Sequence, residues 1–373
     1  METTSAPVSS VAPWNEEVTT VLPMFAIPPE VYQTFNLVVN IILTPLICLL
    51  GIVGNAVGIY IIKKDSDSKK QTIYTYMLSL MTFDIGLLVV GIIACVSETI
   101  KYYDVYLGNF LLEYCPPCKG YGIVVLKHVT AILLIIMSIE RWMSLVFPYT
   151  VKQSVLSKYP RTIVATSFIF SAVYIIPFVA GTRVVPVIDA TNRTIYVGTV
   201  DEDYFEVFFV YTYIETTILH YIAPLGVLVF NVLIIIAYSR LVKQRTSVKP
   251  SQITDNQRKI TLVVLGVASL YVMLSLPNMF VQTLIFIDED YSFYGTQGLT
   301  FRFFIDLGDL MSRINAASDF FMYILVSSHY RAIFQSMIYR RDTGYRSSTT
   351  NSSGSTKERN ISSISVGQGF NHI

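Results

Sequence analysis

The stretch that decides the fold is residues 121–147, YGIVVLKHVTAILLIIMSIERWMSLVF. It is almost continuously apolar, and a bilayer core about 30 Å thick needs roughly 20 apolar residues at the rise of a helix. Its apolar residues do not alternate with polar ones, as they would in the strands of a membrane barrel. The stretch therefore predicts a membrane-spanning helix.

Six further stretches have a similar length and character, so we expect spans at 36–62, 73–97, 121–147, 161–181, 212–241, 260–286 and 299–328. The composition agrees, because 53% of the 373 residues are hydrophobic and 14% are charged, where a soluble domain has about 25% charged residues. We predict an all-α membrane protein, a seven-transmembrane helix bundle. A net charge of +1 and four cysteines exclude a basic nucleic-acid-binding protein and a disulfide-stapled secreted scaffold.

The basic residues predict the orientation. Of the 27 Lys and Arg residues, 20 lie in segments 63–72, 141–161, 240–259 and 329–359, and short loops rich in Lys and Arg stay on the cytoplasmic side. We therefore expect a multi-pass protein of the plasma membrane with four regions. These are an extracellular amino-terminal segment (1–35), the seven-transmembrane domain (36–328), a short amphipathic eighth helix on the inner leaflet (329–339) and a disordered cytoplasmic tail (340–373).

The outer loop between the fourth and fifth spans has the pattern of a β-hairpin. Residues 183–188 and 194–200 are rich in β-branched side chains, and residues 189–193 supply turn residues between them. Asn192 begins the sequon Asn-Arg-Thr in that turn. We expect a hairpin lid that is glycosylated at Asn192, so that the protein would be a glycoprotein.

Polar residues and prolines recur inside the spans in a recognisable order. They are Gly54-Asn55, Leu80 with Asp84, Glu140-Arg141-Trp142 followed by Phe147-Pro148, Pro224, Leu276-Pro277, Asn315 with Asp319 and Tyr323, and Tyr330-Arg331. In this order the chain resembles the rhodopsin-like (class A) G-protein-coupled receptors over about residues 36–340. Residues 140–149 and the short basic third inner loop are also similar to invertebrate neuropeptide receptors of the FMRFamide type.

The resemblance implies roles for two sets of residues. Glu140, Arg141 and Tyr323 would form the G-protein switch. Asn55, Asp84, Thr130, Asn315 and Asp319 would form a polar network, in which a sodium ion held by Asp84 and Asp319 would act as an allosteric modulator. Two neighbouring carboxylates do not both stay ionised without a cation or a shared proton. A purely structural hydrogen-bond network is the alternative.

The cysteines depart from the family pattern. Residues 182–211 contain no cysteine, so the bridge that the family forms between this loop and the third helix cannot form. The close spacing of Cys115 and Cys118 allows a local disulfide in an oxidising setting. Free thiols, or pairing of either residue with Cys95, stay open, whereas a redox motif of the thioredoxin kind lacks its βαβ context.

Helical phase predicts which residues of the third span face inward. Ile123 and Lys127 lie on the face of Arg141, whereas His128 points elsewhere. A lysine inside a membrane helix needs an acid or a ligand anion. The other expected pocket residues are Glu98, His220, Asn278, Gln282, Asp309 and Arg313, with an internal salt bridge as the alternative for the last two.

These residues and an acidic outer rim, which includes Asp201 and Asp288, predict a cell-surface receptor for an extracellular ligand, most simply a basic or amidated neuropeptide. Its other partners would be membrane lipid, a heterotrimeric G protein, and arrestin and receptor kinases at residues 347–356. No nucleophile and base pair or phosphate loop indicates an enzyme, and no nucleic-acid partner is expected. The alternatives are a chemosensory receptor for a small molecule, and an ion channel or transporter.

Overall fold

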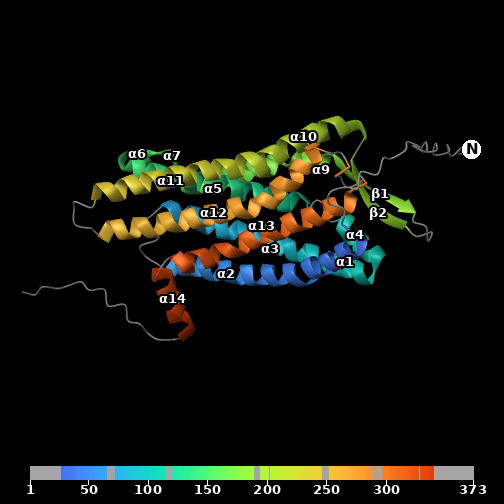
Figure 1. Cartoon of the computed structure of the whole chain (residues 1–373), viewed down its shortest axis with the longest axis horizontal. Helices are drawn as coiled ribbons and strands as arrows, with labels where there is room; N and C mark the ends of the chain where they lie inside the picture. Colours follow the sequence, from blue (N-terminus) through green and yellow to red (C-terminus); the bar gives the residue numbers. More distant parts are fainter. Residues whose placement is uncertain are drawn as a thin grey trace, which may run out of the picture. The chain divides into compact units, whose positions relative to one another are not determined.

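The computed structural model describes residues 27–64, 72–114, 120–188, 194–200, 202–245, 252–287, 290–291, 296–326 and 328–339. The chain divides into two compact units, residues 1–334 and 335–373. The first unit contains a bundle whose long helices run side by side (Figure 1).

The long helices follow one another in the order of the predicted spans. They are α1 (Pro29–Asn36), η1 (Leu37–Leu43) and α2 (Thr44–Lys64) in one continuous run, α3 (Thr72–Tyr103), α5 (Gly122–Val146), α8 (Pro160–Tyr174) with α9 (Ile176–Ala180), α10 (Phe205–Thr217) with η5 (Ile218–Ile222) and α11 (Ala223–Arg245), α12 (Gln252–Ile287), and α13 (Gly298–Val326). The shorter elements are α4 (Val105–Tyr114), α6 (Pro148–Gln153), α7 (Val155–Lys158), β1 (Thr182–Ile188), β2 (Thr194–Val200), η4 (Glu202–Tyr204) and α14 (Ser328–Tyr339).

Five of the described helical stretches are long and apolar enough to cross a membrane, namely Pro29–Lys64, Thr72–Tyr103, Gly122–Val146, Phe205–Lys243 and Arg258–Leu284. The two other predicted spans are helical but less typical. α8 has 15 residues, and the chain turns at Ile175 before Pro177 at the start of α9. α13 carries Arg302, Asp306, Asp309, Arg313 and Asp319. A short helix and a charged one therefore complete the bundle.

The first helix begins at Pro29, seven residues before the expected start at residue 36. Proline suits the first position of a helix, because its fixed φ is helical and the missing N–H has no partner there. The hydroxyl of Tyr32 donates a hydrogen bond to Oδ2 of Asp306 at 3.1 Å, and the rings of Phe35 and Phe303 lie 4.1 Å apart. The end of the predicted amino-terminal segment is thus a helix that packs on α13.

The predicted hairpin is confirmed. β1 and β2 pair antiparallel, from Thr182 opposite Val200 to Ile188 opposite Thr194. The hairpin lies at one end of the bundle, and the α6–α7 segment lies at the other (Figure 1). The turn at residues 189–193, with the predicted glycosylation site Asn192, lies outside the described residues.

Small residues let α2 approach α13 closely. Gly51, Gly54 and Asn55 are buried, whereas Leu50 and Val53 on the same helix are exposed at the outside of the bundle. The amide Nδ2 of Asn55 donates to the carbonyl oxygen of Ala316 at 2.8 Å. This inverted arrangement, with apolar residues outside and small or polar residues inside, is typical of membrane helices.

Replacing Gly51 by alanine should destabilise the bundle. The added Cβ would lie 2.6 Å from Cβ of Ala317, and overpacking of this kind costs about 1–3 kcal/mol. We expect a lower thermal unfolding midpoint for the purified variant in detergent. Gly226→Ala is the matched control, since its Cβ would meet its nearest neighbour at 3.9 Å. Equal midpoints for the two variants would contradict this packing.

Candidate functional site

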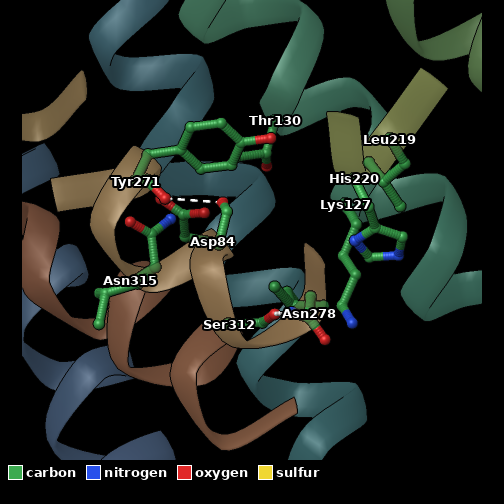
Figure 2. Close-up of a pocket in the computed structure, with 12 residues that line it drawn as sticks. Asp84, Lys127, Thr130, Leu219, His220, Tyr271, Asn278, Ser312 and Asn315 are labelled. Atoms are coloured by element: carbon green, nitrogen blue, oxygen red, sulfur yellow. Dashed lines mark hydrogen bonds between the residues drawn. The ribbon is translucent and has the colours of Figure 1, made fainter. Parts of the chain in front are cut away.

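A cavity inside the bundle brings together residues from α3, α5, η5, α12 and α13. It is lined by Asp84, Leu87, Lys127, Thr130, Leu219, His220, Tyr271, Leu274, Ser275, Asn278, Ser312 and Asn315. Figure 2 shows Lys127 and His220 beside each other at one side of the cavity, and Asp84, Tyr271 and Asn315 gathered at the other. The cavity therefore joins residues predicted for the ligand pocket to residues predicted for the polar network.

The cavity is small. Its volume is about 50 Å³, and a single water molecule occupies roughly 10–15 Å³ on this measure. A few water molecules or one ion would fill it, so a ligand larger than that enters only if the surrounding helices separate.

The polar side of the cavity holds oxygen atoms without hydrogen-bond partners among the described residues. These atoms are both carboxylate oxygens of Asp84, Oγ1 of Thr130 and Oδ1 of Asn315, and Oδ1 of Asn55 is a further one that does not line the cavity. The carboxyl group of Asp319 lies against that of Asp84, and both are buried. Buried polar atoms are normally paired with protein, water or an ion. This set of oxygen atoms therefore suits water molecules or a hard cation as partners.

An ion pair between α5 and α13 lies beside the other side of the cavity. Nζ of Lys127 lies 2.8 Å from Oδ1 of Asp309. Nη2 of Arg313, one turn along α13, lies 3.8 Å from Oδ2 of the same carboxylate. Asp309 and Arg313 do not line the cavity, but they determine the electrostatic environment of Lys127, which does.

His128 makes a polar contact with a different helix. Its Nε2 lies 3.1 Å from Oε1 of Glu215 on α10, and its ring lies 5.6 Å from the ring of Tyr174 on α8. His128 does not line the cavity, although its neighbour Lys127 does. Consecutive residues of α5 thus bind α13 in one direction and α10 in another.

The G-protein switch predicted at the other end of α5 has a defined geometry. Nε of Arg141 donates to Oε2 of Glu140 at 2.8 Å, and Nη2 donates to Oε1 at 3.1 Å. Both side chains are buried, so this two-pronged pair is shielded from water and strong. Tyr323 on α13 is buried near Asp319, and its hydroxyl has no partner among the described residues.

Several predicted site residues lie away from the cavity. Ile123 packs against the apolar cluster of Cys48, Leu87 and Leu88. Glu98 and Gln282 do not line the cavity. Cys115 and Cys118 lie outside the described residues. Cys48 and Cys95, which the structure does describe, are both buried. The part of the chain that the structure describes contains no cluster of three or more His, Cys, Asp or Glu residues that could hold a metal.

Two polar residues of the cavity, Ser275 and Ser312, were not predicted, whereas Asn278 was predicted for the ligand pocket. The hydroxyl of Ser275 donates to the carbonyl oxygen of Tyr271, one turn earlier on α12, at 2.7 Å. Asn278 donates to the carbonyl oxygen of Gly308 at 3.1 Å, which fixes α12 to α13 one residue after Pro277. Ser312 carries no signal of its own in the sequence. Only the packing of α12 on α13 brings it to the cavity.

Residues 54–315 match the family described as 7 transmembrane receptor (rhodopsin family). A probable G-protein coupled receptor of Caenorhabditis elegans is 21% identical over 325 residues, which cover 82% of this chain and 70% of the relative. The family match extends over well more than half of the chain.

The chain therefore belongs to the rhodopsin family of seven-transmembrane receptors. It is a multi-pass cell-surface receptor that binds an extracellular ligand and couples to heterotrimeric G proteins, and it is not an enzyme. Family membership decides against the channel or transporter alternative.

Proposed function

We propose that the amino terminus and the β1–β2 hairpin face the outside, and that the ligand is a peptide. The basic inner segments support this orientation, because the α6–α7 segment lies opposite the hairpin (Figure 1) and carries Lys152 and Lys158. The Glu140–Arg141 pair would then lie at the cytoplasmic mouth.

A peptide is favoured by the charges around the hairpin end. The exposed side chains of Asp203, Glu206 and Asp290 belong to this rim. Asp201, Asp288 and Glu289, and the side chain of Glu202, complete it in sequence but lie outside the described residues. A field of this sign attracts a basic ligand over long range. The cationic Lys127 beneath the rim favours a ligand that also has a negative group. A peptide can have both basic and acidic groups.

Signalling would begin with the release of Arg141. While Arg141 donates both hydrogen bonds to Glu140, it is not available to a G protein. A ligand that binds the active arrangement better shifts the equilibrium toward it. Pro277 interrupts the hydrogen bonding of α12 and offers a bend for outward movement of that helix.

Ligand-dependent nucleotide exchange tests this function. We expect pools of short synthetic peptides to accelerate exchange on a heterotrimeric G protein in membranes that contain the receptor. Arg141→Ala should reduce the acceleration at least about tenfold, equivalent to about 1.4 kcal/mol. The exposed Lys152, at the same end of the bundle, gives the control Lys152→Ala, which should respond as the wild type does.

Activation by pools of small organic molecules and by no peptide pool would instead establish a chemosensory receptor. Absence of exchange with both kinds of pool would contradict the proposal.

A sodium ion is proposed as an allosteric modulator in the polar network. The residues fit it, because the unpaired oxygens of Asn55, Asp84, Thr130 and Asn315 are the ligand type that hard cations prefer. A cation would also stabilise the adjacent carboxylates of Asp84 and Asp319 in their ionised form. Bound there, it would favour the arrangement in which this network stays closed.

Sodium chloride should therefore lower basal nucleotide exchange relative to choline chloride at equal ionic strength. The effect should disappear in Asp84→Asn, which loses the carboxylate charge, and remain in Glu206→Gln, which loses an exposed carboxylate. If the wild type shows the same exchange rate in both salts, the sodium proposal is wrong, and the polar residues form a hydrogen-bond network with a structural role only.

The remaining partners lie beyond the bundle. We propose that arrestin and receptor kinases act on the Ser- and Thr-rich residues 347–356, which lie outside the described residues. α14 (Ser328–Tyr339) would lie on the inner leaflet as an amphipathic helix. Phe334 of this helix already lies 5.7 Å, ring to ring, from Phe320 of α13.

A further inference from the structure

The ion pair between Lys127 and Asp309 crosses the bundle beside a cavity too small for a peptide. A ligand that enters the cavity must meet Lys127, which lines it. Where α5 and α13 separate to admit it, the 2.8 Å contact between Nζ and Oδ1 breaks unless the ligand replaces one of the two groups. The ligand can replace either the cation or the anion, and the two choices differ in what they leave behind.

Replacing Lys127 leaves an uncompensated cation. Among the described residues, Asp309 is the one acid within ion-pair distance of Lys127. The cationic Lys127 would then lie beside the half-buried imidazole of His220, at the same side of the cavity. A charge inside a membrane bundle that loses its partner is unfavourable. The binding free energy of a ligand ammonium or guanidinium at Asp309 would therefore be reduced by the cost of leaving Lys127 without a partner.

Replacing Asp309 leaves no such cost, because a second cation is already beside it. Arg313 approaches the other carboxylate oxygen, Oδ2, at 3.8 Å, and its Nη1 has no hydrogen-bond partner among the described residues. A small side-chain movement would give Asp309 a charge-assisted hydrogen bond to Arg313. The carboxylate thus has a cation to accept it when Lys127 is taken by a ligand.

We infer that the ligand of this receptor presents an anionic group, such as a carboxylate, to Lys127, and that Asp309 is transferred from Lys127 to Arg313 as it binds. Among the described residues that line the cavity, the cation Lys127 and the polar His220 lie at one side, and the one acid, Asp84, lies at the other. The inference rests on the proposed function, in which this cavity receives part of an extracellular peptide. The peptide would carry basic groups for the rim and an acid for Lys127.

The side-chain NMR signal of Lys127 tests this inference in the full-length receptor labelled with ¹³C-lysine. The signal is assigned by its loss in Lys127→Arg or, if that variant does not fold, in Lys127→Gln. The probes are propionate, propionamide and propylammonium, which are similar in size and differ in charge. We expect propionate alone to shift the Lys127 signal in a saturable way, and the signal of the exposed Lys152 to show no saturable shift.

Arg313→Gln should weaken the propionate response at least about tenfold, within the usual range of coupling between sites, because Asp309 then keeps Lys127. Arg313→Lys should retain most of the response. A saturable shift with propylammonium in place of propionate, no shift with any probe, or an unchanged response in Arg313→Gln would each overturn the inference.

The outcome is separable from that of the proposed function. If peptides stimulate nucleotide exchange but propionate does not shift the Lys127 signal, this inference alone is overturned. Saturable binding of propionate without any peptide response would overturn the peptide receptor and keep the anion site.

Discussion

A charge inside a membrane bundle has no water to solvate it, so it must find a partner on its own helix or on another one. In this receptor the third membrane helix, α5, carries four ionisable residues with partners of this kind. Lys127 pairs with Asp309 on α13 and His128 with Glu215 on α10, while Glu140 and Arg141 pair with each other. The first two pairs connect three helices at one level, and the third leaves a self-contained pair at the far end of the same helix.

This arrangement suggests how events at one end of α5 could reach the other. The cavity extends from Lys127 to Asp84, and Asp84 lies against Asp319, one turn from the buried Tyr323. Movement of α13 relative to α5 would therefore change both the ion pair and the polar network. Asn278, after Pro277, ties α12 to Gly308 on the same segment of α13, so that the bend of α12 is part of the same unit.

Much of the fold could be predicted from the sequence, because apolar length and loop charge depend on the bilayer rather than on packing. The order of the long helices and the β-hairpin follow from such patterns. The start of the first helix at Pro29 does not, because it depends on contacts of Tyr32 and Phe35 with α13. Nor does α4, a short helix with no periodic signal long enough to separate it from a loop.

Individual site residues were harder to predict for a related reason. Helical phase gave the direction of Lys127 and Ile123 from α5, but neighbouring helices decide that Lys127 reaches the cavity and Ile123 packs in an apolar cluster. The π-helical turn η5 (Ile218–Ile222) changes which residues of the fifth helix face inward, and it places His220 at the cavity. No residue pattern in the sequence signals that turn.

The central claim is that polar contacts between ionisable residues of neighbouring helices fix the arrangement of those helices. The contact between His128 and Glu215 allows the most direct test because it lies outside the cavity. A double-mutant cycle would compare the unfolding free energies of His128→Phe, Glu215→Leu and the combined variant. The account predicts that each single change is destabilising and that the double variant recovers part of the loss, with a coupling of about 1–3 kcal/mol. Effects that add to within about 0.5 kcal/mol would contradict it.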